Sequence, residues 1–429
     1  MRSAISLALV LMGAAFGSDA GGSPLAAVTP GATVLNPPWI AALREADALK
    51  LTFRGVLQSA ETPNGPWNDR LDDASPFIVP ATEPQGYFRA RQPDSVFARR
   101  SMALIRLRGP FQAHFELAYA GLPDGIFPPV REKPYFDGTL AIDGYELPAT
   151  FRVRGNSSLQ ECPFPKLKFK VSREPREGTP FFDAREVKIA THCAEGGRGT
   201  IGRLRDETAA YREVLAYEVM DLLGFVSPRV RRARIEYHDA TSRAAPAETE
   251  WTVTRSAMIF DDIEVVAERL GGRALDDEEI SALTDAGFDE QLIVDLRFLH
   301  ALLGNWHYAL SANGRELWNT EVIELEGGSL VPVAGDFDLS SWVTEIVRGS
   351  APHDYRPELA PLDRQTRYEL EQIQQSVSGE RFRAAHDRFV AQRAALEDQL
   401  GAATIDEAGR TNALGHATVF FGVLASVVR

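Results

Sequence analysis

The chain has 429 residues, of which 44% are hydrophobic and 25% are charged, a composition typical of a folded globular protein. This length allows two or three domains, each with its own core. The net charge of −14 at pH 7 argues against nucleic acid or an anionic membrane as the main partner, but it does not exclude a local basic groove for phosphate.

A short apolar stretch opens the chain. Residues 4–16 follow Met1 and Arg2, and small residues suited to cleavage come next, which predicts a signal peptide over residues 1–20. A short buried helix is the alternative. The stretch is too short to span a bilayer about 30 Å thick, so no membrane span is expected after signal cleavage. We therefore expect a secreted, periplasmic or cell-surface protein.

Residues 21–44 are rich in Gly, Pro and Ala and predict a linker. The following stretch, residues 45–95, alternates short strand-like runs with turn residues. It resembles the small β-sandwich module of many exported bacterial proteins. This resemblance implies a role in display or adhesion, without chemistry of its own.

The rest of the chain begins with strands and ends with helices. Strands are predicted over residues 102–108, 114–119, 139–142, 150–154, 167–171, 230–237 and 251–260, with one helix among them at 207–223. Later helices are predicted over 264–270, 289–303, 365–377, 380–400 and 404–428. This order predicts an α+β fold of two lobes, with a β-rich N-lobe over about 100–262 and a helical C-lobe over about 263–402. Residues 403–429 are expected to form a docking helix; a membrane anchor is the alternative, but the apolar run at 414–428 is shorter than the roughly 20 residues that a span needs.

Cys162 and Cys193 are the only cysteines of the chain. In an oxidising compartment they can form one disulfide between neighbouring segments, or they can remain two buried thiols. Their spacing is not that of a metal site.

An acidic pair follows a predicted apolar strand. Asp336 and Asp338 flank Phe337 directly after residues 330–333, and Asn319 precedes a predicted hairpin that leads to them. An amide, a hairpin and then an acidic residue form the metal-binding half of a protein-kinase active site. The competing interpretation is a solvated turn.

Basic and polar residues on the N-terminal side complete the pattern. Residues 154–158 read Arg-Gly-Asn-Ser-Ser, and their amides and hydroxyls could cradle an anion. Three lysines at every second position of 166–170 share one face of a strand, where they would meet phosphate oxygens. Glu213 lies on or beside the inward face of the helix at 207–223 and could hold a phosphate-binding lysine. A solvated strand face and a solvated glutamate are the alternatives.

These residues resemble the spore-coat CotH kinase family, in its exported bacterial branch. The resemblance covers about residues 102–345 and rests on the runs at 154–158, 187–193, 211–217, 230–235, 259–262, 304–305 and 335–338. It implies an atypical protein-kinase fold that binds ATP with Mg²⁺ or Mn²⁺ between two lobes. The family's activity is transfer of phosphate to Ser or Thr of protein substrates, here an unidentified secreted or surface protein.

The resemblance also implies a role for each matching residue. Lys168 corresponds to the nucleotide-binding basic residue, with Lys170 as its neighbour, and Glu213 to the glutamate that pairs with it. Asp261 falls where adenine would lie, and Asn319 and Asp336 correspond to the metal ligands, with Asp338 as the second acid. The candidate cofactor-binding set is Arg154, Asn156, Ser157, Lys168, Lys170, Glu213 and Asp261.

One position departs from the family pattern. The catalytic loop is expected to contain an aspartate, but the run Gly-Asn-Trp-His-Tyr at residues 304–308 places His307 there. Either His307 accepts the proton of the acceptor hydroxyl, or Asp338 has taken that role, or the protein binds nucleotide without efficient transfer. The competing class of function is a catalytically weak pseudokinase that acts as an exported scaffold or adhesion protein.

Overall fold

The structure is a computed structural model, and it divides into two compact units. The residues that it describes are 39–45, 48–54, 56–62, 66–70, 77–80, 87–91, 93–98, 101–119, 133–155, 159, 162, 164–172, 176, 178–192, 207–240, 252–305, 307–310, 317–345 and 362–427. The first unit comprises Met1–Arg99, Thr139–Ala149 and Val171–Arg185, and the second comprises Arg100–Gly138, Thr150–Lys170 and Glu186–Arg429. The predicted signal peptide and most of the predicted linker lie outside the described residues.

The first unit contains two small sheets, each of three strands, in the orders β1-β2-β5 and β4-β3-β6. Their core includes Leu51, Leu57 and Phe88. The strands are β1 (Trp39–Glu45), β2 (Ala48–Arg54), β3 (Val56–Ala60), β4 (Asn68–Asp69), β5 (Phe77–Pro80) and β6 (Tyr87–Arg91). The end of the predicted linker is thus corrected, because Trp39–Glu45 pairs antiparallel with β2 along its whole length.

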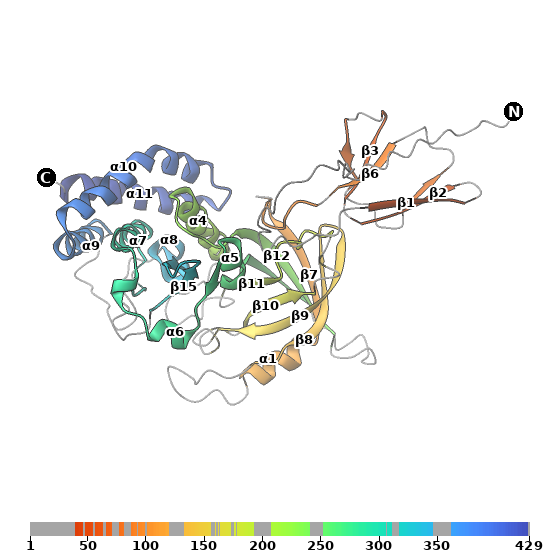
Figure 1. Cartoon of the computed structure of the whole chain (residues 1–429), viewed down its shortest axis with the longest axis horizontal. Helices are drawn as coiled ribbons and strands as arrows, with labels where there is room; N and C mark the ends of the chain where they lie inside the picture. Colours follow the sequence, from red (N-terminus) through yellow and green to blue (C-terminus); the bar gives the residue numbers. More distant parts are fainter. Residues whose placement is uncertain are drawn as a thin grey trace, which may run out of the picture. The chain divides into compact units, whose positions relative to one another are not determined.

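Seven strands form a closed barrel in the order β10-β11-β13-β12-β7-β8-β9 (Figure 1). They are β7 (Ala103–Gly109), β8 (Phe136–Ile142), β9 (Tyr145–Arg154), β10 (Lys166–Val171), β11 (Glu186–Thr191), β12 (Val230–Asp239) and β13 (Thr252–Asp261). Along β7, buried and exposed residues alternate strictly, so one face of the strand points into the barrel core. The period-two pattern that predicted these strands arises from this division between core and surface.

One predicted strand is a helix. The alternating run at 114–119 belongs to α1 (Phe111–Tyr119), which begins directly after Pro110. Asp239 at the end of β12 accepts a hydrogen bond from the first-turn amide of Gln112 (2.9 Å) and so caps the helix. Phe111 and Phe115 lie one turn apart and are both buried. The four-residue spacing of these two phenylalanines indicates a helix, but the alternating pattern of residues 114–119 favoured a strand.

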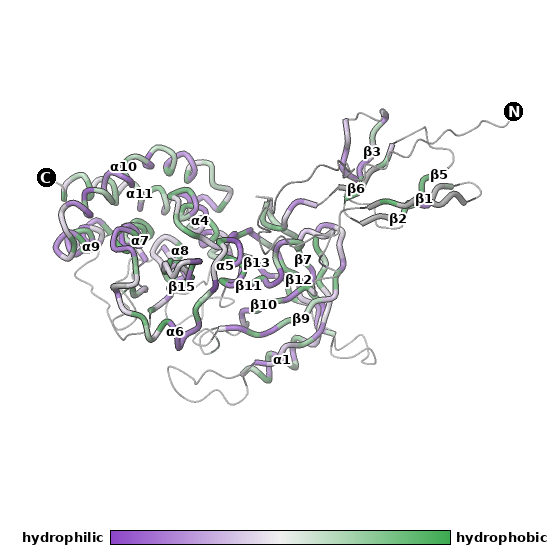
Figure 2. Tube along the Cα trace, viewed as in Figure 1, coloured by the Kyte–Doolittle hydropathy of each residue, from purple (hydrophilic) through white to green (hydrophobic). Residues whose placement is uncertain are grey.

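The C-terminal part is mainly helical. Helix α4 (Ala209–Leu222) lies between barrel strands β11 and β12 in the sequence. The helices described after the barrel are α5 (Ile263–Arg269), α6 (Asp277–Ser281), α7 (Glu290–Leu303), α8 (Ser341–Thr344), α9 (Leu362–Ser376), α10 (Gly379–Ala402) and α11 (Glu407–Val427). A small antiparallel sheet accompanies them, in the order β14 (Gly272–Ala274), β15 (Thr320–Leu325) and β16 (Leu330–Ala334). Hydrophobic and hydrophilic residues follow one another at short intervals along the helices (Figure 2). The buried ones join α4, α7, α10 and α11 in one core.

The mixed α+β class predicted from the sequence is confirmed, with a β-rich part first and a helical part after it. Among the helices that the structure describes, none has both the length and the apolar content needed to cross a bilayer.

Candidate functional site

A cavity of about 430 Å³ lies in the second unit, between barrel strands, helix α4 and the β15–β16 hairpin. Its volume falls in the range of small-molecule sites. Part of its wall is apolar, and the rest carries cationic and acidic side chains. The apolar residues include Phe260, Ile263, Val266, Leu317 and Val333, and the charged ones include Arg154, Lys166, Lys188, Glu213, Glu321 and Asp336.

The acidic turn after β16 forms one edge of this cavity. Asp336 has a left-handed backbone (φ 54°), and its amide donates a hydrogen bond to the Tyr217 hydroxyl (3.1 Å). Phe337 is buried and packs edge-on against the Tyr217 ring, with ring centroids 5.0 Å apart. The two acids of the turn differ in burial. The Asp336 side chain is 46% exposed, whereas that of Asp338 is 3% exposed.

Lys166, the first residue of β10, meets both acids. Its Nζ lies 3.2 Å from Asp338 Oδ2 and 3.7 Å from Asp336 Oδ1. Burial lowers the pKa of Lys166, but the neighbouring Asp338 and Asp336 outweigh that effect and raise it above the ordinary value. The ammonium group is therefore held charged in a buried position by carboxylates from a distant part of the chain.

Lys168 does not occupy this position. It pairs with Glu186 and lies 3.6 Å from Asp262, while Lys170 lies 3.1 Å from Glu186. The expected pairing of Lys168 with Glu213 is therefore corrected. All three lysines share one face of β10, as predicted, because Leu167 and Phe169 are completely buried between them. Two residues along a strand span about 6.6 Å, so only the first lysine reaches the acidic turn.

Glu213 lies on α4 one turn before Tyr217 and is 2% exposed. Burial raises the pKa of Glu213 to about 8, and the negative charges of Asp338 and Asp336 add to this, against the opposing effect of Lys166. Among the described residues, its Oε2 has no hydrogen-bond partner. At neutral pH this carboxyl is therefore mainly protonated in the folded protein.

Arg154 adds a second cation. Its Nε donates a hydrogen bond to the Ile189 backbone oxygen (3.3 Å), and its guanidinium lies 5.0 Å from the centre of the Phe260 ring. Burial lowers the pKa of Arg154, and the nearby Asp336 and Glu213 partly offset this. The positive charges of Arg154 and Lys166 thus face the carboxylates of Asp336 and Asp338. An arrangement of this kind suits an anion bound together with a cation.

Asn319 and His307 lie together at the other side of the hairpin. The amide nitrogen of Asn319 donates to the His307 backbone oxygen (2.8 Å) and lies 3.1 Å from His307 Nδ1. The indole N–H of Trp318 donates to His307 Nε2 (2.8 Å). An indole nitrogen is only a donor, so Nε2 accepts this bond and carries no proton. Both ring nitrogens therefore already have neighbours.

Asp261 lines the cavity but uses its carboxylate within the protein. Arg229 donates to both of its oxygens (2.8 and 3.0 Å), and Arg269 donates to Oδ2 (2.8 Å). The expectation that Asp261 lies where a base would bind is compatible with this position, but its side chain is committed to two arginines. Asn156 and Ser157 lie outside the described residues.

A divalent cation was expected at Asn319, Asp336 and Asp338. No group of three or more His, Cys, Asp or Glu side chains among the described residues could hold a metal by itself. Carboxylate and amide oxygens are nevertheless ligands that Mg²⁺ accepts, and Mg²⁺ commonly takes one or two carboxylates together with phosphate oxygens. Asp338 Oδ1 is buried with no hydrogen-bond partner in the described part of the chain. Asp336 and Asn319 therefore fit a metal that arrives with a phosphate ligand, and Asp338 Oδ1 keeps an unused acceptor position.

The sequence interpretation missed two members of the site. Lys166 stood in the recognised lysine run but was not selected, and Tyr217 was used only as a marker of the helix face. The i, i+4 spacing of Glu213 and Tyr217 was the signal that could have identified the second residue. Of the two cysteines, Cys162 is disulfide-bonded, and Cys193 lies outside the described residues.

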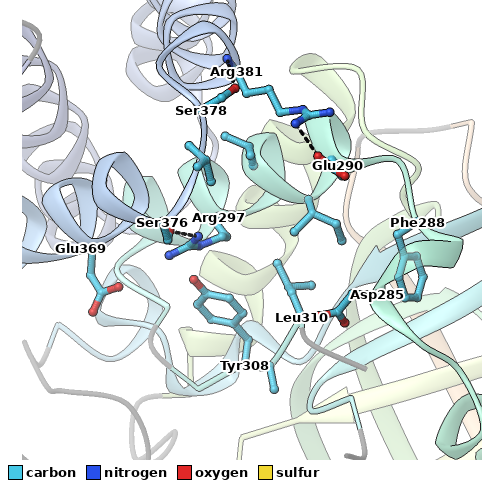
Figure 3. Close-up of a pocket in the computed structure, with 14 residues that line it drawn as sticks. Asp285, Phe288, Glu290, Arg297, Tyr308, Leu310, Glu369, Ser376, Ser378 and Arg381 are labelled. Carbon is cyan, nitrogen blue, oxygen red and sulfur yellow. Dashed lines mark hydrogen bonds and ion pairs between the residues drawn. The ribbon is translucent and has the colours of Figure 1, made fainter. Parts of the chain in front are cut away.

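A second cavity, of about 630 Å³, lies among the helices and was not predicted (Figure 3). Tyr308 and Arg297 point into it, and Arg297 donates to the Ser376 hydroxyl (2.7 Å). Glu290 and Arg381 form an ion pair at its wall. None of the residues predicted to act in binding or catalysis lines this cavity.

No protein-family model and no curated protein matches the chain. Among solved structures, it is similar to the proinflammatory kinase CtkA of Helicobacter pylori, with a TM-score of 0.33 and 8% identity over 62% of this chain and 95% of that chain. It is also similar to hydra Fam20, solved with a sugar, with a TM-score of 0.32 and 14% identity over 61% of this chain and 81% of that chain. Likenesses this weak carry no argument about substrate or activity.

Proposed function

We propose that this chain is a two-lobed, kinase-like protein that binds Mg-ATP (or Mn-ATP) and transfers phosphate to Ser or Thr of a secreted or surface protein. The observation that carries the proposal is the contact of Lys166 with Asp338, which are 172 positions apart in the sequence, beside the 430 Å³ cavity. A basic residue of the barrel and the acidic turn after β16 are the two halves that such a site needs. The resemblance to the CotH family supports the same interpretation, and the predicted signal peptide supports an exported location.

The chemistry of the cavity wall divides in the way a nucleotide requires. Phe260, Ile263 and Val333 offer an apolar surface for a planar base. Lys166 and Arg154 are the cations available to phosphate oxygens, and they replace Lys168 as the proposed phosphate-binding residues. Asp336 and Asn319 supply oxygen ligands for the metal, which when bound would neutralise charge on the phosphates.

The residues of the site also suggest how transfer would proceed. The acceptor hydroxyl oxygen forms a bond to the terminal phosphorus of ATP, the bond to the bridging oxygen breaks, and ADP leaves. The hydroxyl proton needs an acceptor. Because both ring nitrogens of His307 already have neighbours, we assign this role to the oxygen of Asp338 that Lys166 does not contact.

A catalytically weak pseudokinase that serves as an exported scaffold is the second candidate. The observation that favours it is His307 itself, because a neutral imidazole supplies no negative charge where the family has an aspartate. Under this alternative the nucleotide binds and stabilises the fold, but no phosphate reaches an acceptor.

Thermal unfolding with and without nucleotide tests the proposal. Saturating ATP with Mg²⁺ or Mn²⁺, at about 100 times the dissociation constant, should stabilise the protein by about 2.7 kcal/mol, or roughly 5 °C. Lys166→Met and Asp336→Ala should abolish the shift, because they remove the phosphate contact and a metal ligand.

Lys168→Met is the matched control, since this lysine lies on the same strand face but pairs with Glu186 and Asp262. It should retain most of the shift. Absence of any shift in the unmodified protein would contradict nucleotide binding. A shift without transfer of labelled phosphate would leave the pseudokinase alternative.

A further inference from the structure

The glutamate of the site lies on α4, next to a buried arginine that the proposed reaction does not use. Arg212 is 4% exposed and directly precedes Glu213. Successive residues of a helix point about 100° apart, so the two side chains leave α4 in different directions. Glu213 faces the cavity, while Arg212 faces α8 and the start of α11.

The guanidinium of Arg212 joins three segments. It donates to both carboxylate oxygens of Asp406, from Nε at 3.0 Å and from Nη2 at 2.8 Å. Its Nη1 lies 2.8 Å from Glu345 Oε1 and donates to the Val343 backbone oxygen (3.2 Å). Glu345 and Val343 belong to the segment directly after the acidic turn. A single side chain thus connects the helix of Glu213 with the element that follows Asp338.

The start of helix α11 also contacts both α4 and the segment that follows the acidic turn. Asp406 caps it by accepting from the Gly409 amide (2.8 Å) and also accepts from the Thr208 hydroxyl at the start of α4 (3.1 Å). Asn412 donates to the backbone oxygens of Ser341 and Trp342, both at 2.9 Å. The first two turns of α11 therefore contact both α4 and α8.

We infer that Arg212, clamped by Asp406 and Glu345, is a positioning residue that fixes Glu213 relative to Asp336 and Asp338. The inference rests on the proposed function, because its effect is expressed in nucleotide binding. Bidentate arginine–carboxylate pairs are directional, so the clamp sets the rotation and the axial position of α4 as well as holding it in place.

Gly409 provides a sharp test. A Cβ at this position would lie 2.5 Å from Arg212 Nε, so alanine must displace the guanidinium. Gly415, in the same helix, has nothing within 4 Å of its Cβ position. Both Gly→Ala changes improve intrinsic helix propensity, so a purely structural role for α11 predicts similar behaviour for the two variants. Gly409→Ala should weaken Mg-ATP binding about tenfold in the full chain, whereas Gly415→Ala should leave it unchanged.

A double-mutant cycle separates positioning from general destabilisation. Asp406→Asn should also weaken Mg-ATP binding about tenfold, and this loss should disappear in a Glu213→Ala background if the clamp acts through Glu213. Asp295→Asn is the stability control, because it breaks the Asp295–Arg388 pair between α7 and α10 (2.5 Å) away from the cavity. Equal loss of affinity in Asp295→Asn, or a loss that persists with Glu213→Ala, would overturn the inference.

Amide hydrogen exchange keeps the inference testable without nucleotide. Gly409→Ala and Asp406→Asn should speed exchange in residues 209–217, whereas Gly415→Ala should not. If the unmodified protein binds no Mg-ATP but exchange behaves as expected, the proposed function fails and the clamp on α4 stands. Unchanged exchange in both variants would contradict the clamp, whatever the nucleotide result.

Discussion

His307 is the residue at which the proposed site differs most from the family that the sequence resembles. Trp318 and Asn319 both contact its ring, so it is held in a fixed place at the end of the hairpin. An aspartate at this position could still accept a hydrogen bond from the amide of Asn319. It would also add the negative charge that a neutral imidazole lacks.

We therefore expect His307→Asp to raise the rate of phosphate transfer about tenfold or more, with little change in nucleotide affinity. Incorporation of labelled phosphate from ATP measures the rate, and thermal shift measures the affinity. His307→Asn is the matched control, because it has the size of aspartate without its charge. A fall in rate for His307→Asp would instead identify the histidine as a participant in the reaction.

The choice between Lys166 and Lys168 shows what sequence patterns can predict about helices and strands and what they cannot. Period-two alternation correctly placed the lysines of β10 on one face, and helical spacing correctly predicted α4 with Glu213. Neither pattern shows how barrel strand β10 is aligned with the turn after β16. This alignment decides which lysine contacts Asp338. Alternation also failed at residues 114–119, where the phenylalanines of α1 follow a helical spacing and a Pro precedes the helix.

Two buried histidines, His300 on α7 and His416 on α11, make the folding stability depend on pH. Burial lowers the pKa of His300 to about 3 and that of His416 to about 4, from an ordinary 6.5. The unfolded chain therefore binds protons first as the pH falls. Folding stability is unaffected by these groups above about pH 6.5 and declines below it, by up to about 1.4 kcal/mol per pH unit for each histidine.

We expect the free energy of unfolding to fall between pH 6.5 and 4.5 more steeply in the unmodified protein than in His300→Gln. Denaturant titrations at several pH values measure this slope, and the variant should lose up to about 1.4 kcal/mol per pH unit of it. His386→Gln, beside Asp387 on α10, is the control. An identical slope in His300→Gln and the unmodified protein would show that His300 is not the group responsible.

The cavity and the C-terminal helices share one hydrophobic core. Phe337 of the acidic turn and Tyr217 beside it belong to the same buried cluster as Phe420 and Leu424 of α11. The sequence interpretation placed residues 403–429 after the kinase-like domain as a separate docking helix. The hydrophobic pattern could show that this helix has an apolar side, but not that the side packs against the elements that carry the site.

Deleting residues 404–429 should therefore disrupt the second unit as a whole. Phe420, Phe421, Val423 and Leu424 are at most 6% exposed, and burial of four such side chains contributes roughly 6–12 kcal/mol. This equals the entire stability of a typical domain, about 5–15 kcal/mol. We expect the truncated protein to lack a single cooperative thermal transition by circular dichroism. Deleting residues 1–38, the predicted signal peptide and most of the linker, is the control and should preserve that transition. If the protein without residues 404–429 melts within a few degrees of the full chain, the shared core is contradicted.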